Sequence, residues 1–316
     1  MSEFLMKGHF YDSKYILGPW MLSEKKDGMS ALWDGGYSCG KKLIDIPYAN
    51  EHKVHDPDSV ICTGLWSRMG KVIQAPPSFI KRMPMGMMLT GELFAGAGNF
   101  QQTISVVRKK EPILAEWKGI TFNVFDAPNR HIFKERAIRV ANGKYWVIPD
   151  MEDVAVKLCI GGGKLLYFQD IYEQLCELGI ENKVLKIIKQ EKVDSGVNLI
   201  KRRDKIIAKG GEGIVLRHRM SVWSPERVKE LFKMKGLLDC HCSVIGSKMG
   251  SGRNAGVIGS WLVEVISGEE SLIGKTFYVN AKGDDDRTAN RVGSEVKVWY
   301  RELTDAGIPK DGRLDK

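Results

Sequence analysis

The sequence lacks the patterns of a membrane protein, a secreted protein and a zinc protein. No run of 18 apolar residues occurs in its 316 residues, so no segment is predicted to cross a membrane. The N-terminal stretch "MSEFLMKGHFYDSKY" has no apolar core of a secretory signal, which predicts a reducing, cytoplasmic setting. The six cysteines include no Cys-x-x-Cys pair, which argues against structural zinc. Cys240 and Cys242 alternate as in a strand, which predicts two reduced thiols on one face.

Carboxylates are outnumbered by basic residues. Asp and Glu total 39 against 48 Lys and Arg, which gives a net charge of +9. This surplus suits a polyanionic partner such as nucleic acid, although many basic proteins have no such partner. Hydrophobic residues make up 43%, and the length allows two domains or one large domain.

The first two thirds of the chain mix strand patterns with one clear helix. Residues 15–150 read mostly as short strands between turn residues, clearest in "GMMLTGELF" and "GITFNVFDA". In "FQDIYEQLCELG" the apolar residues recur at helical spacing and Gly179 predicts the stop; "VLKIIKQEK" continues in a similar style. Strand patterns recur further along the chain, in "GGEGIVLRHR" and "KELFKMKG".

The last eighty residues contain short strand patterns. "CHCSVIG", "SWLVEVISG", "KTFYVNAKG" and "EVKVWYREL" are four short strand candidates separated by glycine-rich turns. This pattern predicts a small antiparallel barrel. There is no internal repeat and no low-complexity segment.

Lys25 and Asp27 form the first candidate site, in "SEKKDGMSALWDGG". Extended residues alternate faces, so these two side chains are expected to point the same way. The Asp-Gly pair favours a tight turn that would hold them at the mouth of a sheet. A lysine near cations or in a dry site loses its proton more easily and becomes a nucleophile. A solvated surface turn is the alternative reading.

The second candidate is a pair of lysines in "LFKMKG". Lys233 and Lys235 leave one face of a strand and repel each other unless an anion such as phosphate lies between them. A solvated basic edge explains the pattern equally well.

The third group consists of carboxylates and an aromatic residue on strands. Glu212 in "GGEGIVLRHR" shares a face with apolar residues, so it needs a base or a metal as partner, and Glu92 in "LTGELF" repeats the theme. Phe125 in "TFNVFD" lies on the polar face, where it could stack on a base or simply pack.

The order of these motifs resembles the covalent nucleotidyltransferase superfamily, and within it the small bacterial and phage type of ATP-dependent DNA ligase. The resemblance runs from about Trp20 to the C-terminus and rests on "SEKKDGMSALWDG", "LWSRMGK", "TGELFAGAGNFQQTISVVRK", "GGEGIVLR" and "LFKMKGLLDCHCSVIG". Segments 37–61 and 127–211 match poorly. The implied fold is α+β: a nucleotidyltransferase (adenylation) domain of antiparallel sheets with flanking helices at 1–236, then an all-β OB-fold barrel at 237–316.

The resemblance implies a role for each matching residue. Lys25 resembles the lysine that attacks the α-phosphate of ATP and forms a lysyl-AMP; Asp27 resembles the carboxylate that orients the site. Lys233 and Lys235 match the lysines that bind the α-phosphate, and they are expected to favour the neutral form of Lys25. The resemblance also implies that Arg68 contacts ribose and nucleic-acid phosphate, that Glu92 contacts ribose, and that Phe125 and Ser23 contact adenine. Glu212 and Glu92 are expected to bind metal. Arg313 and Lys316, in the final "GRLDK", are expected to bind pyrophosphate.

One position departs from the family pattern. The usual motif is Lys-x-Asp-Gly-x-Arg, but Ser30 stands where the arginine is expected, and Arg108 is a candidate to replace it. The hairpin around "SGEESLIGKTF" leaves no room for a long DNA-encircling insertion. An NAD-dependent ligase is disfavoured because its N-terminal module and zinc cysteines are absent.

The sequence therefore predicts a monomeric DNA ligase that uses ATP and Mg²⁺, with Mn²⁺ as a substitute, to seal nicks in duplex DNA. Two alternatives stay open. One is an RNA ligase or an mRNA-capping nucleotidyltransferase. The other is a non-catalytic nucleic-acid-binding protein, which the presence of Lys25, Glu212, Lys233 and Lys235 disfavours.

Overall fold

The computed structural model describes residues 5–11, 13–46, 48–128, 166–236, 238–300, 302–304, 306–310 and 312–315, and the backbone of 138–139 and 145–146. The chain divides into two compact units, Met1–Met234 and Lys235–Lys316. Each unit has its own buried apolar core, and the first unit contains two five-stranded sheets.

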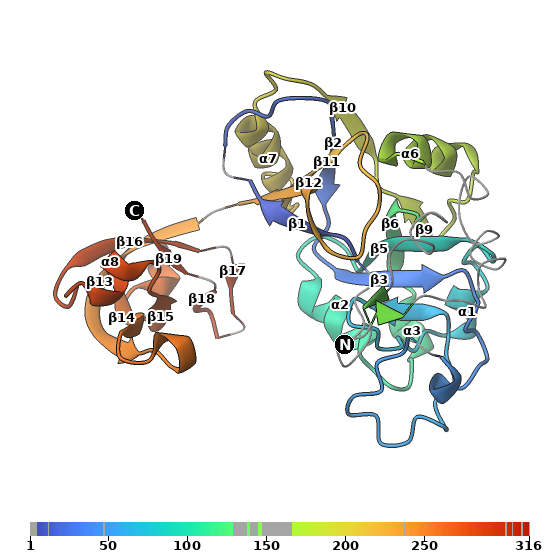
Figure 1. The fold of residues 1–316 in the computed structure, drawn as a ribbon, viewed down its shortest axis with the longest axis horizontal. Coiled ribbons are helices and arrows are strands. Elements are labelled where there is room, and N and C mark those ends of the chain that lie inside the picture. The colour runs from blue at the N-terminus through green and yellow to red at the C-terminus, as the bar shows by residue number, and fades with distance from the viewer. Residues whose placement is uncertain are drawn as a thin grey trace. The chain divides into compact units, whose positions relative to one another are not determined.

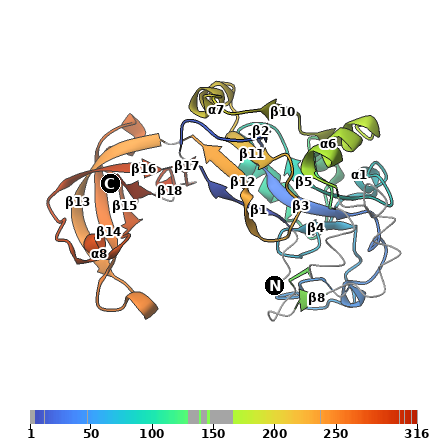
Figure 2. The same ribbon diagram turned by 45° about the horizontal axis from the view of Figure 1, so that its top comes forward.

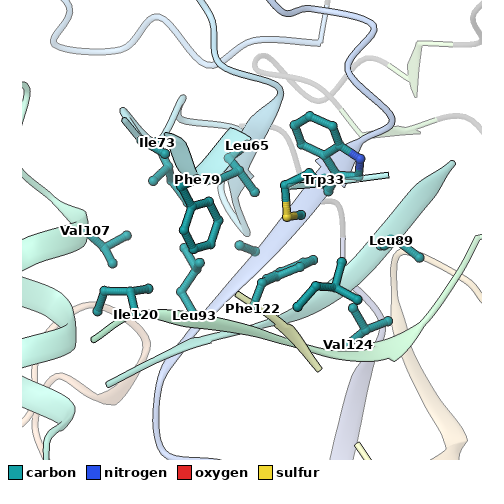
Figure 3. Packing of buried hydrophobic residues seen from close by; sticks show 14 of the residues in the cluster. Trp33, Leu65, Ile73, Phe79, Leu89, Leu93, Val107, Ile120, Phe122 and Val124 are labelled. Atoms are coloured by element: carbon teal, nitrogen blue, oxygen red, sulfur yellow. The ribbon is translucent and has the colours of Figure 1, made fainter. Parts of the chain in front are cut away.

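The first sheet of the first unit has the strand order β4-β3-β5-β6-β9. Its strands are antiparallel neighbours except for the parallel pair β6 and β9. Alternate residues of β3, β5 and β6 point to one face, where they form the main core with residues of the flanking helices (Figure 3). The elements are β3 (Met29–Asp34), β4 (Leu65–Ser67), β5 (Met88–Phe94), β6 (Thr121–Asp126), β9 (Leu185–Ile187), η1 (Leu43–Asp45), α1 (Pro77–Ile80), α2 (Phe100–Val107), α3 (Leu114–Trp117) and α6 (Phe168–Glu177).

The second sheet of this unit has the order β1-β12-β11-β2-β10. One of its faces buries Trp20, Leu22, Ile214 and Leu216 against Leu199 of α7. Figure 1 shows α7 beside β11 and β12. The elements are β1 (Lys7–Phe10), β2 (Trp20–Lys25), β10 (Gln190–Val193), β11 (Gly213–His218), β12 (Arg227–Lys235) and α7 (Leu199–Ile207), and a separate pair is formed by β7 (Ile138–Arg139) and β8 (Tyr145–Trp146).

The chain passes from one sheet to the other through Lys26, Asp27 and Gly28. β2 lies in the second sheet and β3 in the first, and the order of strands shows that they are not hydrogen-bonded neighbours. The expected turn is therefore a crossing between two sheets. This crossing places the end of β2 close to both sheets.

The second unit is a curled five-stranded sheet of order β15-β14-β13-β16-β19, with bulges that bend β13 (Figure 2). A Cβ on Gly312, just before β19, would lie 3.2 Å from Phe277 of β15 and 3.3 Å from Val298 of β16, so the end strands approach each other as in an OB-fold barrel. The elements are β13 (Leu238–Met249), η4 (Gly252–Asn254), β14 (Ile258–Ser267), η5 (Glu270–Leu272), β15 (Thr276–Asn280), α8 (Asp284–Thr288), β16 (Glu295–Tyr300), β17 (Glu302–Leu303), β18 (Pro309–Lys310) and β19 (Arg313–Leu314).

The α+β fold class is confirmed, and most expected elements are present. The helix at Phe168–Glu177 buries Ile171 and Leu175, and Gly179 follows it with a positive φ of 57°. Cys240 and Cys242 lie on β13 as free thiols, both buried, with their sulfur atoms 3.6 Å apart. Of the helices in the part of the chain that the structure describes, none is long and apolar enough to cross a membrane.

One expectation about helices and strands is wrong. The segment "VLKIIKQEK" forms strands β9 and β10 instead of continuing the helix, because it pairs with β6 and β2 at the edges of the two sheets. Short apolar runs do not distinguish a helix from a strand without this tertiary pairing. Residues 15–150 also contain α1, α2 and α3 between the strands.

Candidate active site

Lys25 lies at the end of β2, next to the crossing between the sheets. It pairs with Gly213 at the start of β11, and Glu212 directly precedes that strand. Lys25 Nζ lies 2.5 Å from Glu212 Oε2, and both side chains are largely buried. Its amine also donates to the carbonyl of Lys26 at 3.3 Å. Two chain segments almost 190 residues apart thus fix the Lys25 amine.

The charges around Lys25 hold it as an ammonium group. Burial by itself lowers the pKa of Lys25, but the carboxylates of Glu212, Glu92 and Asp27 outweigh burial and raise the pKa above its ordinary value. The expectation that neighbouring lysines favour the neutral amine is therefore wrong for this structure. The dominant neighbours are carboxylates, so the proton must be removed before Lys25 can act as a nucleophile.

Glu92 lies on β5 directly opposite Ser30 of β3. The Ser30 hydroxyl donates to Glu92 Oε2 at 2.9 Å. Burial raises the pKa of Glu92 to about 7, although Lys25 and the Ser30 hydrogen bond both act to lower it. Ser30 therefore contacts the site from the position where the family pattern has arginine. Arg108 is exposed at the C-cap of α2.

Gly28 is required by the close approach of β5. A Cβ at this position would lie 2.2 Å from the Leu93 carbonyl oxygen and 2.9 Å from Glu92 Cγ. Contacts below 3.0 Å force atoms to move, so only glycine lets the crossing pass this strand. The Gly of the Lys-x-Asp-Gly motif thus brings the crossing and Glu92 together.

Phe125 occupies a β-bulge. Thr90 of β5 pairs with Asp126, but the next residue, Gly91, pairs with Val124, so Phe125 is the extra residue on β6. Phe122 and Val124 point into the main core, whereas Phe125 is half-buried. A bulge redirects a side chain and is common beside active sites.

Ser23 lies on β2, and Arg68 directly follows β4. Ser23 is buried on β2, two residues before Lys25 and therefore on the same face. Ser67 ends β4 and pairs with Ala31, so the exposed Arg68 leaves this strand at the end of the sheet where Ser30 lies.

Of the remaining candidate residues, Lys233 and Lys235 lie on β12 and Arg313 lies on β19. Lys233 Nζ lies 4.6 Å from the centre of the Phe10 ring, in a cation–π contact. Lys235 ends β12 and is the first residue of the second unit. Arg313 is exposed on β19, where it pairs with Trp299. Lys316 lies outside the described residues.

Sequence reasoning missed a buried ion pair between the two sheets. Arg217 of β11 donates to Asp126 of β6, and these side chains are 5% and 0% exposed. Arg217 also donates to Ser221 Oγ at 2.9 Å, and its guanidinium lies 4.1 Å from the centre of the Phe168 ring. The arginine at the end of the apolar "GIVLR" stretch was the available signal, because a buried cation needs a partner.

The carboxylates of the site fit a magnesium ion that arrives with a nucleotide. Among the described residues, no group of three or more His, Cys, Asp or Glu side chains could hold a metal ion. Nucleotide-bound magnesium needs only one or two protein carboxylates, with phosphate and water as the other ligands. Glu212 and Glu92, which interact electrostatically, offer such oxygen donors.

The proteins that are similar to this chain include DNA ligases. A DNA ligase of Haemophilus influenzae is 23% identical over 311 residues, 97% of this chain and 89% of that protein. A solved structure from a structure–function study of Lig E DNA ligases has a TM-score of 0.65 at 22% identity, over 100% of this chain and 99% of the other. The structure named Pmar-Lig_PreS3 has a TM-score of 0.63 at 14% identity, and the match covers 100% of this chain and 68% of the other chain. No family model matches the chain.

The likeness to the Lig E structure spans 100% of this chain and therefore includes both compact units. The chain is thus similar over almost its whole length to a DNA ligase, and its fold is that of the solved Lig E DNA ligase structure.

Proposed function

We propose that this enzyme seals nicks in duplex DNA through a covalent AMP carried on Lys25, with residues 1–236 as nucleotidyltransferase domain and 237–316 as OB-fold domain. The observation that carries the proposal is the position of Lys25, which lies 2.5 Å from Glu212 and within the field of Glu92 and Asp27. A lysine with this many carboxylate neighbours at a sheet crossing does not lie in a solvated surface turn. The similarity to DNA ligases supports DNA as the substrate, and the motif order in the sequence supports ATP as the cosubstrate.

In the first step, Lys25 Nζ forms a bond to the α-phosphorus of ATP. The bond from that phosphorus to the bridging oxygen breaks, and pyrophosphate leaves with the electron pair. Lys25 must first lose a proton, and the Glu212 carboxylate is within hydrogen-bond distance to receive it. Nucleotidyl transfer depends mainly on positioning and charge neutralisation, so the fixed amine supplies the first requirement.

The surrounding residues hold the nucleotide. Glu92 accepts a hydrogen bond from a ribose hydroxyl, and Arg68 contacts ribose and DNA phosphate. Phe125 stacks on the adenine ring, and Ser23 contacts the edge of that ring. Lys233 and Lys235 neutralise the α-phosphate, and Arg313 and Lys316 bind the leaving pyrophosphate. Magnesium, or manganese in its place, held by Glu212 and Glu92, supplies Lewis-acid charge neutralisation when it is bound.

In the later steps AMP passes to the 5′-phosphate of the nick, the 3′-hydroxyl attacks this phosphate, and AMP leaves. A monomer suffices because all the named residues belong to one chain. The net charge of +9 gives affinity for the phosphate backbone without sequence preference.

The test is covalent labelling followed by sealing. The protein is incubated with Mg²⁺ and α-labelled ATP, GTP or NAD, denatured, and examined for retained label, and is then given nicked DNA or nicked RNA. Label from ATP and sealing of DNA are expected. Label from GTP would favour a capping enzyme, sealing of RNA alone an RNA ligase, and no label a non-catalytic protein.

A further inference from the structure

The basic charge of this protein is concentrated in one part of the first unit. Residues 183–209 contain nine Lys and Arg residues and three Asp and Glu residues. Much of this excess lies on α7 and the turn after it, in the sequence "LIKRRDKIIAK". No assigned role in nucleotide binding uses this helix.

α7 has a buried apolar side and an exposed basic side. Leu199 is fully buried and Ile206 is partly buried in the core of the second sheet. Lys201, Lys205 and Lys209 are exposed and spaced four residues apart; the first two lie on one side of α7, and Lys209 lies in the turn that follows the helix. We call these three residues the lysine row. At 1.5 Å per residue the row spans about 12 Å.

The lysine row is not used for ion pairs within the part of the chain that the structure describes. The other two cations of α7 are paired, Arg202 with Glu191 and Arg203 with Asp204, and the second pair neutralises the carboxylate beside the row. None of the three row ammonium groups has such a partner among the described residues. Three like charges without a counter-ion repel one another, which favours a polyanion that lies along them.

The row leads toward the active site. Lys209 is followed by Gly210 and Gly211, and a Cβ on Gly211 would lie 3.3 Å from Glu24 Oε1, beside Lys25. Glu212, the partner of Lys25, is the next residue. A polyanion on the row therefore approaches the residues that carry the proposed chemistry.

We propose that the lysine row binds the phosphate backbone of duplex DNA that flanks the nick. The inference rests on the proposed function, because it takes nicked DNA as the substrate. Phosphates recur about every 3.4 Å of axis along one DNA strand, so three flexible lysines over about 12 Å can each reach a separate phosphate. Such contacts position the duplex and read no base sequence.

The test compares the salt dependence of DNA binding between two triple variants. One variant carries Lys201→Ala, Lys205→Ala and Lys209→Ala; alanine favours the helix, so α7 is expected to form. The matched control carries Lys81→Ala, Lys118→Ala and Lys183→Ala, three exposed lysines next to α1, α3 and β9 with the same total charge change. Affinity for a nicked duplex is measured by fluorescence anisotropy from 50 to 300 mM salt.

The row variant should reduce the slope of log affinity against log salt by about 2–3, because about 0.9 counterion is released per phosphate contact. The control should keep the wild-type slope, and a triple Lys→Arg row variant should keep it as well. Self-adenylylation should stay within twofold of wild type, which also shows that the row variant is folded. Equal slopes for the row and control variants would overturn the proposal. Failure of the wild type to take label or seal nicks would overturn the proposed function instead, and the slopes would still show whether the lysine row contacts DNA phosphates.

Discussion

At the scale of single residues, Glu92 has the most informative ionisation. Its pKa of about 7 means that the folded protein holds a proton between about pH 4.5 and 7 that the unfolded chain has already lost. Folded-state stability from this group is present at low pH and decreases as pH rises toward 7, because the buried carboxylate must then ionise.

We therefore expect Glu92→Gln to gain stability over the wild type as pH rises from 5 to 8. Glutamine keeps the shape of protonated Glu92 and never ionises, so the difference should grow by about 1–3 kcal/mol across this range. Urea unfolding of both proteins at several pH values measures it. A difference that is constant with pH would show that Glu92 ionises normally in the folded protein.

At the scale of elements, Gly28 fixes the crossing between the sheets. In Gly28→Ala the new Cβ would meet the Leu93 carbonyl oxygen at 2.2 Å, so the crossing must move away from β5. We expect a loss of about 1–3 kcal/mol in the free energy of unfolding and slower self-adenylylation, because Lys25 and Glu92 separate. Gly119→Ala is the control, since its Cβ would meet no atom within 4 Å and its φ is not positive. Equal behaviour of the two variants in unfolding and labelling would contradict the role of Gly28.

The ion pair of Arg217 and Asp126 connects β11 with β6, and therefore the two sheets. Asp126→Asn leaves the Arg217 cation buried without its counter-ion, which should cost about 3–5 kcal/mol in the free energy of unfolding. Asp58→Asn removes the carboxylate of an exposed pair with Lys42 and should cost less than about 1 kcal/mol. Urea unfolding compares them, and a loss at Asp126 as small as that at Asp58 would show that the buried pair adds nothing.

The sequence predicted the elements better than their connections. The alternation in "TFNVFD" and the spacing in "FQDIYEQLCELG" reflect local burial, so β6 and α6 could be predicted. The strands in "VLKIIKQEK" depend on partners at two sheet edges, and the bulge at Phe125 depends on the register of β5. The Lys25–Glu212 contact joins residues 187 apart in sequence, so only the family resemblance, not local periodicity, linked them.

At the scale of the whole molecule, the two units have separate cores. A fragment ending at Gly236 keeps all of β12 and should fold without the second unit. We expect it to bind nicked DNA with a smaller salt slope than the full chain, to seal few ordinary nicks, and to join pre-adenylated nicks slowly. Anisotropy and sealing assays on both proteins measure this. Equal slopes and equal sealing would show that the second unit takes no part in holding DNA.

The central claim is that Lys25 carries the AMP. Lys26 is its matched control: it neighbours Lys25 but pairs with Glu24 at 2.8 Å and lies over the Phe94 ring instead of meeting Glu212. The most direct measurement is mass spectrometry of peptides after incubation with ATP and Mg²⁺, for the wild type, Lys25→Ala and Lys26→Ala. We expect the adenylyl group on Lys25 in the wild type and in Lys26→Ala, and no adenylylated peptide in Lys25→Ala. An adenylyl group on another residue, or label retained by Lys25→Ala, would contradict the account.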